Sequence, residues 1–221
     1  MMDVSFDFET CALCPTAAVM SLGAVAWNRN ATNSPFEACD AMPRYMEFSA
    51  HVDLRGMFVD GFTFDRQTAD WWARRGDNAK KAVLASDSAE SPCSPIQNVI
   101  SDFFDWLADL KSSAGGAPLC LWCQGTDFDM AILRNICSRY GMEIPVPYQN
   151  FRDHRTFFME GARSICNAAG KEFNADRAYS LFKSYDGQGD VHDPIYDCKR
   201  SIYATWQVMK HQQGMNLNSK E

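Results

Sequence analysis

An alternating pattern in the first ten residues restricts how this chain can fold. Apolar residues at positions 4, 6 and 8 alternate with polar residues at 5, 7 and 9, and this period of two predicts a strand over residues 4–8 with its apolar side chains turned to a core. Asp7 and Glu9 then share the opposite face of the strand. Neighbouring carboxylates stay ionised at low cost only beside a positive charge, and a divalent cation with oxygen ligands is the usual solution. Taken alone, a D-x-E pair is common and more typical of a solvated strand face.

The other predicted elements indicate an α/β domain. Strands are expected over residues 17–27, 45–52 and 118–123, and helices over 68–75, 77–85, 96–110, 128–140 and 193–211. Residues 94–97 have the sequence of a capping box with Pro95 at the first helical position, and Gly141 is the residue expected to end the helix over 128–140. Three strands followed by alternating helices and strands predict a mixed central sheet, a three-stranded antiparallel meander plus parallel strands, flanked by helices. This order resembles that of the ribonuclease H-like fold.

Length, charge and hydropathy narrow the class of protein. The 221 residues fit one domain, expected over 1–213, followed by a polar tail over 214–221. No apolar run approaches the roughly 18–20 residues of a membrane span, and the N-terminus has no signal-peptide pattern, so we expect a cytoplasmic protein without membrane contact. The net charge of −7 argues against a protein that coats nucleic acid. It does not exclude an enzyme, because cations held by carboxylates reverse the local charge where a phosphate binds.

The cysteines leave a zinc site open as an alternative. An odd number of cysteines, 9 at irregular positions, is more typical of a reducing compartment than of a disulfide framework. Cys11 with Cys14 and Cys120 with Cys123 form two C-x-x-C pairs, a spacing that zinc sites use. The second pair lies inside a predicted strand, where residues i and i+3 point to opposite faces, so buried thiols are the favoured interpretation.

Two further segments carry carboxylates where helices begin. Residues 122–129 leave a predicted strand through a glycine and enter a helix, and α/β sheets place ligands at such strand ends. Asp129 would lie in the first helical turn, where complementing the helix dipole is the alternative role. In residues 192–197, Asp193 and Pro194 suit a helix start, which would bring His192 and Asp197 to one cavity. A loop histidine and a solvated helix carboxylate are the alternative for this segment alone.

The order of the three acidic motifs along the chain resembles that of the DEDDh group of 3′–5′ exonucleases, the DnaQ-like superfamily. These motifs are D-x-E, F-D and H-x4-D. More closely, the chain resembles the branch of phage exonuclease A and the mycobacterial 3′–5′ exoribonuclease-like proteins. That likeness rests on T-x-x-W-W at 68–72, W-x-x-G-x-x-F-D-x-x-x-L at 122–133 and R-D-x-R-T at 152–156. The chain departs from the usual pattern at Gln124, where Asn is common, and in the last motif at Pro194, Ile195 and Cys198.

The resemblance implies hydrolysis assisted by two divalent cations, Mg²⁺ or Mn²⁺. Asp7, Glu9 and Asp197 would hold the first cation, Asp7 would bridge to the second, and Asp129 would contact that second ion. His192 would be the general base toward the attacking water, for which imidazole is suited by its unperturbed pKa of about 6.5. The products would be nucleoside 5′-monophosphates, released from the 3′ end of a single strand.

Substrate contacts are predicted from residue type and position. By resemblance, the backbone near Thr10 would meet the terminal nucleotide. Trp122, Phe128 and Phe151 have rings that stack on bases in other proteins, but aromatic residues in such positions are more often core. Trp71 and Trp72 are expected to pack their own helix against the body, facing different ways.

Two arginines near the middle of the chain have two candidate roles. Arg152 and Arg155 are expected either to pair with phosphate or to order the site by pairing with Asp153 or a motif carboxylate. Single-stranded DNA is favoured over RNA because the likeness to the phage enzymes is strongest, and a phage protein would act in the host cytoplasm. The alternatives are an RNA-trimming 3′–5′ exoribonuclease or a related phosphodiester hydrolase, a non-catalytic nucleic-acid-binding module on the same fold, and the zinc protein. Dimers are frequent in the superfamily, which makes a homodimer one further expectation.

Overall fold

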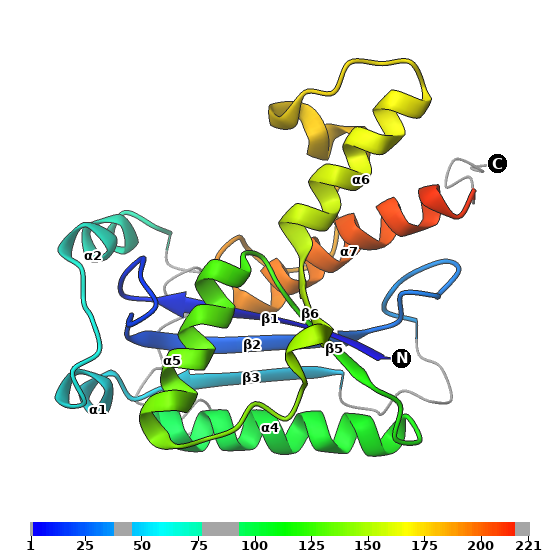
Figure 1. Cartoon of the computed structure of the whole chain (residues 1–221). Helices are drawn as coiled ribbons and strands as arrows, with labels where there is room; N and C mark the ends of the chain where they lie inside the picture. Colours follow the sequence, from blue (N-terminus) through cyan, green and yellow to red (C-terminus); the bar gives the residue numbers. More distant parts are fainter. Residues whose placement is uncertain (1, 38–45, 77–92, 215–221) are drawn as a thin grey trace.

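A six-stranded mixed sheet forms the centre of the computed structural model, which describes residues 2–37, 46–76 and 93–214 (Figure 1). Its strand order is β4–β3–β2–β1–β5–β6. β1 pairs antiparallel with β2, which pairs antiparallel with β3, while β5 and β6 continue the sheet in parallel from β1. The predicted meander plus parallel strands is therefore confirmed. The strands are β1 (Met2–Thr10), β2 (Val19–Trp27), β3 (Glu47–Val52), β4 (Cys93–Ser94), β5 (Leu119–Cys123) and β6 (Phe151–Asp153).

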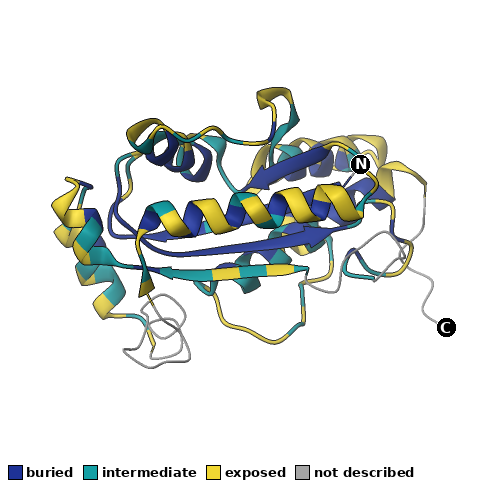
Figure 2. Cartoon of the chain, turned by 90° about the horizontal axis from the view of Figure 1, so that it is seen from below, coloured by how far each residue is buried: buried dark blue, intermediate teal, exposed yellow. Residues whose placement is uncertain are grey.

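Helices cover both faces of this sheet. α4 and α5 pack on one face, and α4 turns its buried residues to the sheet and its exposed residues to solvent (Figure 2). α7 packs on the other face, and α6 packs against α7 and projects from the body (Figure 1). The helices are α1 (Leu54–Val59), α2 (Arg66–Ala73), α4 (Ile96–Ser113), α5 (Ala131–Tyr140), α6 (His154–Ala168) and α7 (Pro194–Gln212), with a π-helical turn η1 (Thr126–Met130) and the 3₁₀ helices η2 (Tyr148–Asn150) and η3 (Ala175–Leu181).

The two faces of β1 follow the alternating pattern. Its apolar residues pack in the core formed with α4 and α5, and Asp7 and Glu9 lie on the side of α7. This second face is less solvated than a polar strand face would be, because Asp3 and Ser5 are fully buried there. α7 shields this face, so the carboxylates farther along β1 stand in a low-dielectric surrounding.

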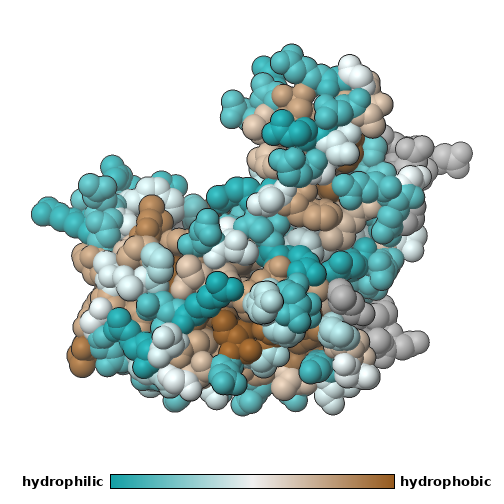
Figure 3. Space-filling model, in the orientation of Figure 1, coloured by the Kyte–Doolittle hydropathy of each residue, from teal (hydrophilic) through white to brown (hydrophobic). Residues whose placement is uncertain are grey.

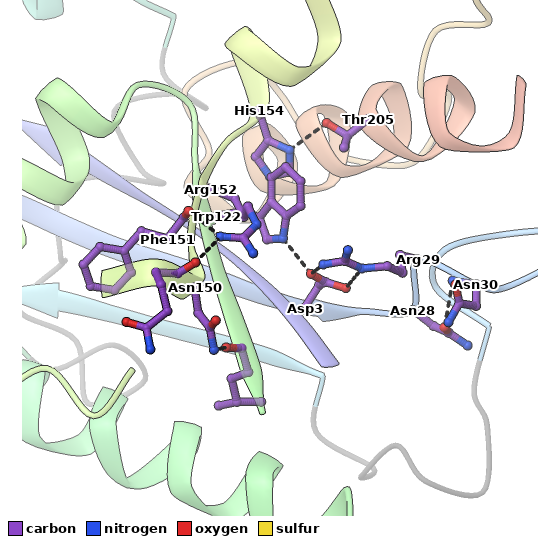
Figure 4. A network of polar contacts seen from close by, with 12 residues as sticks. Asp3, Asn28, Arg29, Asn30, Trp122, Asn150, Phe151, Arg152, His154 and Thr205 are labelled. Atoms are coloured by element: carbon purple, nitrogen blue, oxygen red, sulfur yellow. Dashed lines mark hydrogen bonds and ion pairs between the residues drawn. The ribbon is translucent and has the colours of Figure 1, made fainter. Parts of the chain in front are cut away.

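A buried polar network fixes β1 to β5 and α6 (Figure 4). The indole Nε1 of Trp122 donates to Asp3 Oδ1 at 2.7 Å, and Arg29 donates to both oxygens of Asp3. The ring of His154 stacks on Trp122 with centroids 4.9 Å apart, and its Nδ1 lies 2.7 Å from Thr205 Oγ1 on α7. Burial lowers the pKa of His154 to about 3, so this histidine is a neutral packing residue.

Several helix ends differ in detail from the prediction. The predicted capping box does not form, because Ser94 belongs to β4, where it pairs with Val52 of β3. α4 begins after Pro95 without a side-chain cap. The helix expected over 128–140 starts earlier, as the π-helical turn η1, and ends as predicted at Gly141 with a left-handed φ of 64°. Asp193 caps α7 as predicted, its Oδ1 accepting from the backbone N–H of Ile195 at 2.9 Å. The helix predicted over 77–85 and residues 215–221 of the tail lie outside the described residues.

Two other expectations can be compared with the fold. Cys120 lies in the core under α7 and Cys123 in the core under α4, on opposite faces of β5 as expected, so their sulfurs do not converge on one ion. No helix in the described ranges is long and apolar enough to cross a membrane. α6 and the short strand β6 were not predicted.

Candidate active site

Three elements bring the predicted carboxylates to one place. β1 carries Asp7 and Glu9, η1 carries Asp129 and the start of α7 carries Asp197. The backbone N–H of Phe8 donates to Asp129 Oδ1 at 3.1 Å, which ties η1 to β1 between the first two carboxylates. Ligand atoms of Glu9, His192 and Asp197 all lie within 4.8 Å of one another. The charges of Asp129, Glu9 and Asp197 all act on Asp7, so the four acidic side chains and His192 form one cluster.

A glycine in β2 allows α7 to reach this cluster. Gly23 pairs with Asp7 across β1 and β2. A Cβ at position 23 would lie 2.8 Å from the backbone carbon of Pro194, closer than packed atoms approach. The start of α7 can therefore lie directly on the sheet beside Asp7. Sequence reasoning missed Gly23, because a glycine inside an apolar strand gives no indication of which element approaches it.

A second glycine and a loop contact position Asp129. Gly125 has a φ of 122°, which turns the chain from β5 into η1. The backbone N–H of Thr126 donates to Asp153 Oδ2 at 2.8 Å, which joins this turn to the end of β6. Asp129 is buried as a result, with 2% of its surface exposed.

His192 has a constrained backbone and an aromatic surrounding. Its φ of 76° lies in the left-handed region, and its backbone N–H donates to Asp197 Oδ2 at 2.9 Å. The imidazole meets the rings of Trp71 and Trp72 edge to face, with centroids 4.7 and 5.7 Å away. The indole of Trp72 in turn donates to the carbonyl oxygen of Thr10 at 3.0 Å. The tandem tryptophans therefore hold His192 against the end of β1, a role beyond the helix packing predicted for them.

Burial and mutual repulsion raise the pKa values of the clustered carboxyls. Burial is the larger cause for Glu9, whose pKa rises to about 9, with the charges of Asp197 and Asp129 adding to it. The pKa of Asp129 rises to about 7 through burial, and that of Asp7 rises well above its usual range through burial and the neighbouring Asp129 and Glu9. Without a cation, this site favours protonated carboxyls.

The guanidinium of Arg200 only partly offsets this negative charge. Arg200 Nη2 lies 3.2 Å from Asp197 Oδ1, yet that buried oxygen has no hydrogen bond of suitable geometry. Burial also raises the pKa of Asp197. Mg²⁺ and Mn²⁺ prefer oxygen ligands. The cluster supplies closely placed carboxylate oxygens, one of which has no hydrogen bond, so these residues are suited to hold such a cation.

The predicted substrate residues have different surroundings. Trp122 is buried with 1% of its surface exposed, so base stacking by its ring was a wrong prediction and the core alternative holds. Phe128 is half-buried against the α4-side core. Arg152 donates to the carbonyl oxygens of Gln149 and Phe151, at 2.6 and 2.8 Å, which orients it along the backbone (Figure 4).

Thr10 and Arg155 lie beside the carboxylate cluster. Thr10 is buried, and its Oγ1 donates to the carbonyl oxygen of Ala12 at 2.9 Å. Arg155 is exposed, donates to the carbonyl oxygen of Gln124 at 3.4 Å, and its charge acts on Asp129 to lower that carboxyl's pKa. In the space-filling view, the part of the molecule that contains α2 and the part that contains α6 project on either side of a notch (Figure 3).

The fold and the site together define a DEDDh 3′–5′ exonuclease of the ribonuclease H-like fold. The defining features are the order of the mixed sheet, the D-x-E strand, the Asp129 turn and the helix start that carries His192 and Asp197. The model of the 3′–5′ exoribonuclease Rv2179c-like domain matches residues 2–205 of this chain. The chain belongs to that family and is a 3′–5′ exonuclease.

Solved nucleases share the fold at low identity. The nuclease domain of 3′hExo, described as a DEDDh family member bound to rAMP, is 16% identical with a TM-score of 0.54, over 100% of this chain and 96% of that chain. Cell-death related nuclease 4 (CRN-4) is 16% identical with a TM-score of 0.58, over 96% of this chain and 64% of that chain. No curated protein sequence matches the chain.

Proposed function

We propose that this exonuclease removes nucleoside 5′-monophosphates from the 3′ end of a single strand, using two divalent cations and His192 as the general base. The convergence of Asp7, Glu9, Asp129 and Asp197 beside one imidazole is the observation that supports this proposal. In the proposal, Asp7, Glu9 and Asp197 hold the first cation, and Asp7 and Asp129 hold the second. When bound, the cations supply charge stabilisation for the attacking and leaving oxygens of an in-line displacement.

The surroundings of His192 suit a base. Burial lowers its pKa, and the nearby Asp197 opposes this shift, so the imidazole is largely neutral near pH 7 and can accept a proton. Contact with Trp71 and Trp72 limits the orientations of the ring. A base must be held within hydrogen-bond reach of the water it activates, and the left-handed backbone at His192 helps to fix that position.

In this proposal, the single-stranded nucleic acid enters the site between α2 and α6. The terminal nucleotide lies against the backbone at Thr10, whose carbonyl oxygen is held by Trp72. Arg155, exposed beside Asp129, is suited to pair with a phosphate near the cluster.

The description of the matching family supports RNA, whereas the likeness to phage enzymes favours DNA. We propose single-stranded RNA as the principal substrate and single-stranded DNA as the alternative. Contacts to the 2′-hydroxyl decide between the two, so strands of matched sequence give a direct comparison.

The test is a Mg²⁺- or Mn²⁺-dependent degradation assay on matched single- and double-stranded RNA and DNA, labelled at either end. A 5′-labelled strand should give a ladder that shortens by one nucleotide at a time, and a 3′-labelled strand should release only mononucleotide. Asp7→Asn and His192→Ala should lose most hydrolysis while keeping the fold.

Matched controls separate the site from general effects. Asp102→Asn and His211→Ala change the same residue types at exposed positions on α4 and α7, and both should degrade the strand at the wild-type rate. A folded His192→Ala protein as active as wild type would remove the base assignment. Internal fragments from the 3′-labelled strand would contradict the proposed release of single nucleotides from that end.

A further inference from the structure

A cavity of about 420 Å³ lies where α6, η3 and the loop after η3 meet α7. Its volume falls in the usual range for small-molecule sites, about 300–1,000 Å³. Lys183 and Arg200 are basic, and none of the described residues that line the cavity is acidic. In a chain with a net charge of −7, such a lining is suited to an anion. Most of the remaining wall is aromatic: Phe158, Tyr179, Phe182, Tyr185, Tyr196 and Tyr203.

The aromatic rings form two neighbouring walls. Tyr185 packs against Tyr196 and Tyr203, with centroids 5.6 and 5.9 Å away. On the other wall Tyr179 stacks flat on Phe158, with centroids 4.3 Å apart and an angle of 7° between the rings. Tyr179 keeps 48% of its surface exposed. Exposed tyrosine faces are a surface on which bases of any sequence stack.

The cavity adjoins the carboxylate cluster through Arg200. This residue lines the cavity, and its Nη2 lies 3.2 Å from Asp197 Oδ1. Gln124, at the end of β5, also lines the cavity, and its Oε1 accepts a hydrogen bond from Ser201 on α7. Thr10 follows Glu9 on β1, and its carbonyl oxygen accepts from Trp72 of α2. α2 and α6 lie on opposite sides of the molecule (Figure 1). The cluster therefore lies between Thr10 and the cavity.

We propose that this cavity binds the nucleotide that precedes the 3′-terminal one, with its base on the tyrosines and its phosphate between Lys183 and Arg200. The inference rests on the proposed function, in which the terminal nucleotide occupies the Thr10 side of the cations. The bond to be cut then crosses the carboxylate cluster, and the upstream strand leaves over the basic and aromatic wall. This subsite holds an unpaired base, so it selects single strands.

One wall of the subsite is fixed independently of the side chains that would touch nucleic acid. Gln207 on α7 is buried, and its side chain bonds both backbone groups of Lys183: Oε1 accepts from the N–H at 3.1 Å and Nε2 donates to the carbonyl oxygen at 2.9 Å. The Lys183 side chain itself is exposed. Its removal therefore tests charge at the subsite without loosening the loop.

The test compares two substrates of each enzyme at saturating Mn²⁺. One is a single-stranded oligonucleotide, and the other is the p-nitrophenyl ester of a nucleoside 5′-monophosphate, which has no upstream nucleotide. The subsite variants are Lys183→Ala and Tyr185→Leu. Their matched controls are Lys171→Ala and Tyr148→Leu, which change exposed residues outside the cavity. A thermal unfolding measurement on each variant checks that it is folded.

Each subsite variant should raise the KM for the oligonucleotide about tenfold, as loss of one stacking or phosphate contact does, with a much smaller change in the KM for the ester. The controls should follow wild type on both substrates. Equal changes on the two substrates, or none on either, would overturn the subsite while leaving the exonuclease in place. A wild-type enzyme that hydrolyses neither substrate would overturn the proposed function and the subsite with it.

Discussion

Glu9 should make the metal-free protein less stable as the pH rises. Burial, and then the charges of Asp197 and Asp129, raise the pKa of Glu9 from 4.5 to about 9 in the fold. The folded protein therefore keeps a proton that the unfolded chain releases at lower pH. The stability from this proton is fully present below the unfolded pKa and is lost as the pH rises toward the folded one.

The size of this effect follows from the two pKa values. Between them, each pH unit changes the free energy of unfolding by about 1.36 kcal/mol per group. From pH 6.5 to pH 8, Glu9 therefore accounts for a loss of about 2 kcal/mol. A whole domain is stable by only about 5–15 kcal/mol, and a loss of this size lowers Tm by roughly 4–8 °C in a chain of this length.

Urea unfolding with a chelator at both pH values measures the loss. Wild type should lose about 2 kcal/mol more than Glu9→Gln, whose amide does not titrate. Glu172→Gln changes an exposed carboxylate and should keep the wild-type pH dependence. Adding Mg²⁺ should restore wild-type stability at pH 8, because the cation replaces the proton. An identical pH dependence in wild type and Glu9→Gln would refute the reasoning.

Three substitutions test the contacts that build the site, each measured by urea unfolding. Gly23→Ala should cost about 1–3 kcal/mol and lower the degradation rate, because its Cβ would push Pro194 away from the sheet; wild-type stability and activity would contradict this. Asp193→Ala should cost about 1 kcal/mol through loss of the α7 cap; no loss would show that the cap is dispensable. Trp122→Phe should cost about 1–3 kcal/mol, because the buried Asp3 loses the indole donor; an unchanged stability would contradict that role.

Local patterns were sufficient to predict much of the fold. The alternation in β1 placed its apolar side chains in the core and its carboxylates on the other face. Asp193 and Pro194 marked the start of α7, and Gly141 the end of α5, because caps and left-handed residues depend on nearby backbone groups. The convergence of the three acidic segments was instead implied by the order of their motifs, which resembles that of the DEDDh exonucleases.

Features set by distant contacts could not be predicted in this way. α6 was not predicted, because it contains Gly161 and glycine disfavours a helix by its local propensity. In the fold, the missing side chain of Gly161 lets Val208 of α7 approach, and this packing stabilises the helix. The residue type of Trp122 suggests base stacking, and only the fold shows that β1 and α6 enclose its ring. The tyrosine cavity likewise combines η3, the loop after it and α7, which no local pattern links.

The central claim is that Asp7, Glu9, Asp129 and Asp197 hold two divalent cations beside His192. Anomalous diffraction from a crystal soaked in Mn²⁺ and a nucleoside 5′-monophosphate tests it most directly. The account predicts two Mn²⁺ peaks bounded by oxygens of these four carboxylates, with both peaks lost in Asp7→Asn. Cations bound elsewhere, with this cluster free of metal, would contradict it.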